Sequence, residues 1–371
     1  MTFTPTACPR LVVKIGSSLL VGDEGAVRRE WLETLVADLV ERRSAGQQIV
    51  IVCSGAIALG ARRLGLSHGG RRSLDDAQAA AAAGQIALSQ CWAELLGAHD
   101  IAAAQILVTL GDLEDRRRYL NAAATLDRLI GLGAIPIVNE NDSVATEEIR
   151  FGDNDRLAAR IGQAARADGV ILLSDVEGLF TADPASDADA RLIETVDAID
   201  GDITAMAGSS SGSGLGSGGM ASKVEAARIA TTAGIPLAII SGIEDHPLAR
   251  FAETRRGTVF TAEAGANARK TWLAGRLTVH GCITIDAGAV DALRSGKSLL
   301  PAGATGVTGA FARGDVVEIA GPDGAKIAHG LAEYDADTAA RIVGHRSDEL
   351  GDLLGYAPRA ALVHRDHMVL L

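Results

Sequence analysis

Aromatic residues and cysteines are scarce in this sequence, and both shortages limit what the protein can be. Aromatic residues make up 3% of the 371 residues, whereas 47% are hydrophobic, so alanine, valine, leucine and isoleucine must fill a large core. A chain of this length is enough for two domains. Metal-ligand spacing is absent among the cysteines, and reduced thiols are the simplest interpretation; the four are Cys8, Cys53, Cys91 and Cys282.

Long apolar segments and excess positive charge are also missing. Residues 1–10 contain no apolar signal-peptide core, and no run approaches about 18 apolar residues, so we expect a cytoplasmic protein without a membrane span. The formal net charge of −12 argues against a general nucleic-acid binder, which would need a basic face. None of the eight histidines follows a predicted strand directly, so we expect neither histidine catalysis nor a histidine metal site.

Apolar runs alternate with helical periodicity over the first 240 residues. Such runs predict strands that are buried on both faces, and helices between them imply crossover connections. The sequence therefore predicts an α/β fold with a mostly parallel central sheet sandwiched by helices. The predicted strands are 11–15, 49–52, 101–107, 135–138, 169–173 and 235–240, and the main predicted helices are 27–39, 75–97, 116–130, 153–166 and 221–233.

The composition changes after about residue 262. Short β-like runs at 283–285, 316–319 and 326–328 are separated by turn signals such as Pro322-Asp323-Gly324. This pattern predicts a second, small, β-rich domain.

Polar residues follow several predicted strands: Lys14 and Gly16, Ser54 and Gly55, 139–142, and Ser174 with Asp175. The carboxyl ends of parallel strands meet at one edge of a sheet, where ligands usually bind. Between residues 139 and 155, nine of seventeen residues are Asp, Asn or Glu. A solvated loop with Asp153 as a helix N-cap would explain only part of this cluster, so we interpret it as a polar substrate site.

A run of glycine and serine from Gly208 to Gly219 leads directly into a predicted helix with Lys223 in its first turn. Backbone N–H groups at a helix N-terminus attract phosphate, and a lysine adds positive charge. Two lysines, glycine loops and an Asn/Asp cluster together indicate phosphoryl transfer to a small zwitterionic substrate. A carboxylate acceptor would need no general base, because it is already ionised at neutral pH.

An ordered set of motifs resembles the glutamate 5-kinases (γ-glutamyl kinases) of the amino-acid kinase superfamily. The motifs are Val13–Leu19, Ser54–Ile57, Asn139–Asp142, Phe151–Asp155, Leu173–Asp175, Gly178–Pro184 and Gly218–Lys223. Gly281–Ala289 and Ser298–Pro301 resemble a PUA domain. The resemblance implies an amino-acid kinase catalytic domain at 1–262, a linker at 263–275, a PUA-like domain at 276–355 and a C-terminal tail at 356–371.

This resemblance implies that ATP phosphorylates the γ-carboxylate of L-glutamate to give L-glutamyl 5-phosphate, the first step of proline biosynthesis. It further implies Mg²⁺ carried by the nucleotide, feedback inhibition by proline, a homo-oligomer (dimer or tetramer) and functional coupling to glutamyl-phosphate reductase. Two alternatives stay open at this point. One is another amino-acid kinase acting on acetylglutamate, carbamate, aspartate or a nucleoside monophosphate. The other is an RNA-binding PUA protein, which the acidic balance disfavours.

Residue roles follow from the same resemblance. The implied catalytic residues are Lys14, Lys223 and Asp175, and the implied substrate-binding residues are Ser54, Gly55, Asp142 and Asn154. The implied ATP-binding residues are Lys14, Gly16, Ser174, Asp175, Ser217, Gly218, Gly219, Met220, Ala221, Ser222 and Lys223. No metal ligand is assigned to the protein itself, and Asp153 and Asp155 stay open between helix capping and substrate binding.

Overall fold

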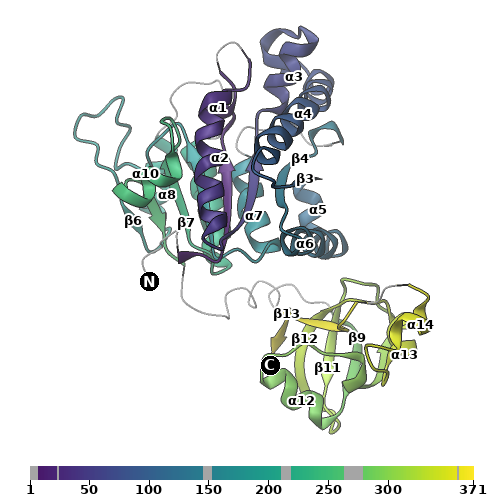
Figure 1. Cartoon of the computed structure of the whole chain (residues 1–371). Helices are drawn as coiled ribbons and strands as arrows, with labels where there is room; N and C mark the ends of the chain where they lie inside the picture. Colours follow the sequence, from purple (N-terminus) through teal and green to yellow (C-terminus); the bar gives the residue numbers. More distant parts are fainter. Residues whose placement is uncertain (1–6, 23–24, 145–152, 210–218, 263–278, 357–358) are drawn as a thin grey trace. The chain divides into compact units, whose positions relative to one another are not determined.

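The computed structural model describes residues 7–22, 25–144, 153–209, 219–262, 279–356 and 359–371. The chain divides into two compact units. The first comprises Met1–Asp115 and Asn121–Glu263, and the second comprises Arg116–Leu120 and Ala264–Leu371. Each unit has its own sheet (Figure 1).

An eight-stranded sheet forms the centre of the first unit, in the order β3-β4-β2-β1-β5-β7-β8-β6. All neighbours pair in parallel except β7 and β8, which are antiparallel. The predicted mostly parallel sheet is therefore confirmed. The strands are β1 Arg10–Ile15, β2 Gln48–Cys53, β3 Ala103–Val108, β4 Ile135–Glu140, β5 Gly169–Ser174, β6 Thr195–Val196, β7 Leu237–Ser241 and β8 Thr258–Phe260.

Helices cover both faces of this sheet. Their bounds are α1 Ser17–Leu20, α2 Arg29–Ser44, α3 Ala56–Leu64, α4 Leu74–Gly97, α5 Leu110–Glu114, α6 Arg116–Gly131, α7 Asp153–Ala164, α8 Gly201–Ser209, α9 Met220–Thr232 and α10 Pro247–Thr254. Residues of α2, α4 and α10 form one buried cluster with alternate strand residues such as Val13 and Ile15. On the opposite face, α7 packs on β1 and β5 and lies against α9. The residue between Val13 and Ile15 is Lys14, which therefore points to the α7 face.

Two strands begin slightly later in the structure than the sequence predicts. Strand β3 begins at Ala103 and β7 at Leu237, each two residues later than predicted. The two buried isoleucines that precede these strands donate their N–H groups back to the previous helix: Ile101 to the carbonyl of Leu96, and Ile235 to that of Ala230. The sequence predicted that both residues belong to strands because they are apolar. Their backbone hydrogen bonds instead end the preceding helices. None of the described helices is long and apolar enough to cross a membrane.

A five-stranded sheet forms the centre of the second unit, in the order β10-β9-β11-β12-β13. All pairs are antiparallel except β9 with β11, and the predicted small β-rich domain is confirmed. Its elements are β9 Val279–Ile285, α12 Ala287–Arg294, β10 Ala304–Gly309, β11 Val316–Ala320, β12 Lys326–Ala332, α13 Ala336–Ile342, α14 Leu350–Leu354 and β13 Val363–Leu370. The segment expected to be a tail, 356–371, instead contains the edge strand β13. Four consecutive polar residues, 364–367, interrupt its apolar pattern, so the sequence did not predict a strand there.

Close packing of α3 against α4 depends on two glycines. A Cβ atom at Gly60 would lie 1.7 Å from the carbonyl oxygen of Ala80, and one at Gly84 would lie 1.8 Å from that of Ala56. Gly84→Ala should therefore lower the free energy of unfolding by about 3 kcal/mol, because the helices must separate. Urea unfolding measures this. Gly97→Ala on the same helix, where a Cβ meets nothing within 4 Å, is the matched control, and equal stability of both variants would contradict the packing argument.

Candidate active site

The polar residues predicted at strand ends do gather at one edge of the first sheet. Strands β1, β2, β4 and β5 are neighbours that run in the same direction, so their carboxyl ends share this edge. The chain leaves β1 toward β2 on one side, whereas β5 and β7 lie on the other side. Such a switch in strand order opens a crevice where ligands bind in α/β sheets. The N–H of Gly16 donates to the carbonyl oxygen of Leu173 at 3.3 Å and holds the ends of β1 and β5 together.

Two buried lysines converge on one carboxylate at this edge. Lys14 lies on β1, Asp155 on the first turn of α7 and Lys223 on the first turn of α9. The ammonium group of Lys14 contacts Asp155 Oδ1, and the Nζ of Lys223 lies 3.2 Å from Asp155 Oδ2. The exposed fraction is 6% for Lys14, 0% for Asp155 and 5% for Lys223. We call these three residues the lysine–aspartate cluster.

Burial and charge act in opposite directions within this cluster. Burial lowers the pKa of Lys14, and the attraction of Asp155 reverses only part of that effect. Burial alone would raise the pKa of Asp155, but the two ammonium groups outweigh it and hold the pKa below its ordinary value. With both lysines protonated, the cluster carries one net positive charge in a site shielded from water. It is therefore suited to attract a phosphate group.

Asp155 thus has a role that neither open interpretation of the sequence included. It pairs with both predicted catalytic lysines. A sequence signal for its burial exists: Asp155 stands three, four and seven residues before Ala158, Ala159 and Gly162, on the apolar stripe of α7. Nothing in the sequence identifies its partners, because Lys14 and Lys223 come from distant segments.

A second pair of predicted residues meets beside the cluster. Asn154 Nδ2 donates to Ser54 Oγ at 2.9 Å. Gly55, which follows Ser54, has a φ of 96° and is the N-cap of α3. The Oδ1 atom of Asn154 is buried and has no hydrogen-bond partner within the described ranges. Because Asn154 and Asp155 are consecutive on α7, the Ser54–Asn154 pair and the lysine–aspartate cluster adjoin each other.

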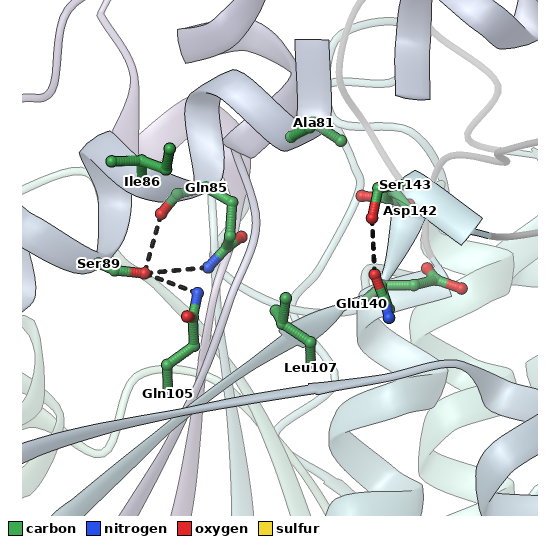
Figure 2. A pocket seen from close by; sticks show the side chains of 11 residues that line it. Ala81, Gln85, Ile86, Ser89, Gln105, Leu107, Glu140, Asp142 and Ser143 are labelled. Carbon is green, nitrogen blue, oxygen red and sulfur yellow. Dashed lines mark hydrogen bonds between the residues drawn. The ribbon is translucent and has the colours of Figure 1, made fainter. Parts of the chain in front are cut away.

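The fourth predicted substrate residue, Asp142, lines a pocket of about 470 Å³ between α4, β3 and the turn after β4 (Figure 2). Asp142 begins a short 3₁₀ turn, Asp142–Val144, and is 8% exposed. Ser54, Gly55 and Asn154 do not line this pocket. Asp142 also acts on Arg71, a residue that sequence reasoning missed: burial lowers the pKa of Arg71, and the Asp142 carboxylate opposes this shift. The lining residues are Ala81, Ala82, Gln85, Ile86, Ser89, Gln105, Leu107, Glu140, Asn141, Asp142 and Ser143.

The predicted nucleotide residues are partly described. Ser174 is buried at the end of β5, and its hydroxyl donates to Asp175 Oδ1 at 3.1 Å. Asp175 is exposed and adds a further attraction that raises the pKa of Lys14. Gly219 is the N-cap of α9, with Met220, Ala221 and Ser222 in the first turn. Ser217, Gly218, Glu147, Glu148 and the side chain of Asp153 lie outside the described residues.

Comparison with known proteins identifies the family of this chain. The sequence model of the amino acid kinase family matches residues 9–241, and that of the PUA domain matches residues 281–354. A protein named glutamate 5-kinase from Zymomonas mobilis is 62% identical over 100% of this chain and 93% of its own length. Another from Sphingopyxis alaskensis is 65% identical over 100% and 99%. Among solved structures, carbamate kinase from Giardia lamblia bound to AMP-PNP has a TM-score of 0.50 at 14% identity, covering 70% of this chain and 100% of that one. This chain therefore belongs to the amino acid kinase family, among the glutamate 5-kinases, and carries a PUA domain.

Proposed function

We propose that this protein transfers the γ-phosphoryl group of ATP to the γ-carboxylate of L-glutamate. The observation that carries the proposal is the lysine–aspartate cluster beside the Ser54–Asn154 pair, which places a buried phosphate-attracting charge next to a polar acceptor site. The relatives named glutamate 5-kinase, which match essentially the whole chain, support the choice of glutamate.

The lysines act on the charge that spreads over the oxygen atoms of the transferred group. The Asp155 carboxylate already holds the ammonium groups of Lys14 and Lys223 in position, so they need little reorganisation when the transition state forms. The acceptor carboxylate attacks phosphorus, the bond from phosphorus to the leaving oxygen of ADP breaks, and the product is an acyl phosphate. No proton has to be removed, because the acceptor is already ionised.

Hydrogen-bond acceptors at the substrate site suit an amino acid with a free ammonium group. Asn154 Oδ1 is a buried acceptor without a partner among the described atoms, and Asp142 supplies a carboxylate. An ammonium group needs such oxygen acceptors, whereas the acetylated amine of acetylglutamate carries no positive charge. Arg71, which Asp142 influences, would provide a positive partner for the α-carboxylate.

In this proposal, ATP binds on the side of the lysine–aspartate cluster away from the Ser54–Asn154 pair. Ser174, Asp175 and the first turn of α9 would hold the nucleotide, and Mg²⁺ would be held by its phosphates. Among the described residues, no group of three His, Cys, Asp or Glu side chains could bind a metal ion. Gly16, at the end of β1, lets the backbone approach the phosphates closely.

The family resemblance extends the proposal to regulation and assembly. Proline would act as an inhibitor at or near the acceptor site, and the enzyme would be a homodimer or homotetramer. An acyl phosphate is a reactive mixed anhydride, which favours functional coupling to a glutamyl-phosphate reductase that consumes it.

A coupled assay of ADP release across acceptors tests the function. We expect turnover with L-glutamate and little with acetylglutamate, carbamate, aspartate or nucleoside monophosphates. An enzyme that turns over one of these acceptors but not glutamate would overturn the proposal.

Ser54→Ala should raise the KM for glutamate about tenfold and leave the KM for ATP unchanged, because it removes one hydrogen-bonding group from the acceptor site. Steady-state kinetics with each substrate varied in turn measures both values. Ser44→Ala is the matched control, since Ser44 is exposed and its hydroxyl donates, within the described part of the chain, to a carbonyl of its own helix. An unchanged KM for glutamate in Ser54→Ala would remove Ser54 from the site.

A further inference from the structure

A chain of hydrogen-bonded amides links the core to the turn that carries Asp142. Asn139 is the residue before the last one of β4 and is 1% exposed. Its Nδ2 donates to Gln85 Oε1 on α4 at 2.7 Å, although the two residues are 54 positions apart in sequence. The Oδ1 of Asn139 accepts the backbone N–H of Glu140 at 2.9 Å.

The chain continues from Gln85 to the wall of the pocket (Figure 2). Gln85 Nε2 donates to Ser89 Oγ at 3.3 Å, and Gln105 Nε2 on β3 donates to the same oxygen at 2.7 Å. The hydroxyl of Ser89 in turn donates to the backbone carbonyl of Gln85 at 2.8 Å. Helix α4 is thereby fixed to β3 and β4 by directional bonds at the level of the pocket.

These amides stand where apolar residues would suffice for packing. Ile135 and Ile137 point to the same face of β4 as Asn139 and belong to the main core cluster. A further apolar residue would hold α4 on the sheet without the cost of burying two amides. Amides differ from aliphatic side chains in fixing direction, because their hydrogen bonds accept only a narrow range of angles.

These hydrogen bonds fix the orientation of the end of β4, just before Asp142. Asn139 holds the peptide N–H of Glu140 from one side, and the N–H of Asn141 donates to the carbonyl of Val108 on β3 at 3.0 Å from the other. The next residue, Asp142, begins the 3₁₀ turn. The orientation of this carboxylate therefore depends on the peptide units that Asn139 and β3 hold in place.

We propose that Gln85 is a positioning residue for the amino-acid substrate: through Asn139 it orients the turn that presents Asp142 to the substrate's ammonium group. This inference rests on the proposed function, because it assumes that Asp142 binds the acceptor. Gln85 does not touch the reacting atoms, so its loss should weaken binding of the acceptor without slowing phosphoryl transfer.

Steady-state kinetics of Gln85→Met tests the inference, since methionine keeps the length of the side chain and removes its hydrogen bonds. We expect the KM for glutamate to rise about tenfold, while kcat and the KM for ATP change by less than about twofold. Gln90→Met is the matched control: Gln90 lies on the same helix, is exposed and bonds Glu94 at 2.9 Å, and its replacement should change neither KM. Gln85→Glu keeps an oxygen acceptor for Asn139 and should restore most of the affinity for glutamate.

The outcomes separate this inference from the proposed function. If wild-type enzyme shows no glutamate-dependent turnover, the proposed function fails. If wild type turns over glutamate and Gln85→Met has an unchanged KM for glutamate, Gln85 has no positioning role. If Gln85→Met raises both KM values and lowers kcat by similar factors, the inference is also overturned, and Gln85 has a general structural role. The same conclusion follows if Gln85→Glu does not recover affinity for glutamate. Should Gln85→Met fail to fold, Ser89→Ala carries the test: a KM for glutamate raised at least about twofold supports the inference, and an unchanged one refutes it.

Discussion

Asp155→Asn should lower kcat by about 10²–10³-fold, because it removes the carboxylate that holds both lysines ready for the transferred phosphate. Asparagine has nearly the same shape, so the packing of α7 on β1 is kept and the charge is lost. Without this charge, Lys14 and Lys223 repel each other in a buried site, and their alignment is no longer maintained. A single-turnover assay, which reports the phosphoryl-transfer step itself, measures the effect.

The same variant should change the pH dependence in a defined direction. Burial already lowers the pKa of Lys14, and the Asp155 carboxylate raises it in part. Losing that carboxylate lowers the pKa of Lys14 further, so this lysine loses its proton at a lower pH than in the wild type. Since the protonated form stabilises the transition state, the alkaline fall of kcat/KM should move to lower pH.

Asp38→Asn provides the matched control for this shift. Asp38 is also buried in the first unit, where it accepts the N–H groups of Leu248 and Ala249 at 2.9 and 3.2 Å. Its replacement should reduce stability but leave the alkaline limb in place. An Asp155→Asn enzyme with a wild-type pH profile and wild-type turnover would show that the lysines do not depend on Asp155.

Lys14→Met should lower kcat by about 10³-fold, because it removes a positive charge from the transferred phosphate in a site shielded from water. Methionine preserves the unbranched apolar stem, and Asp155 keeps Lys223 as its partner at 3.2 Å. The variant should therefore fold, and a thermal unfolding curve would verify this. Near-normal affinity for glutamate is expected, since Lys14 contributes mainly in the transition state.

Lys297→Met serves as the control for Lys14→Met, because Lys297 is exposed and belongs to the second unit. It should have wild-type kinetics. If Lys14→Met kept wild-type turnover while folded, the lysine–aspartate cluster would not be the catalytic centre, even with the family assignment intact.

Much of the fold could be predicted because its causes are local. Apolar runs such as Leu11–Ile15 and Gly169–Leu173 define buried strands, and apolar residues spaced three and four apart define helices such as α4 and α7. The ends were less certain, since Ile101 and Ile235 are buried without belonging to strands. Strand β13 was missed because an edge strand buries only some of its residues, and His364 and Asp366 interrupt its apolar pattern.

The sequence by itself determined the type of fold and pointed to candidate site residues, because apolar periodicity and motifs are properties of neighbouring positions. It placed Lys14, Ser54, Asn154 and Lys223 at strand or helix ends without showing which of them meet. Only the tertiary structure decided that Asp155 bridges the two lysines, that Asn154 bonds Ser54, and that Gln85 supports Asn139. These contacts join residues 54 to 141 positions apart. They exist because helices packed on the sheet bring such residues together, and no local pattern encodes that proximity.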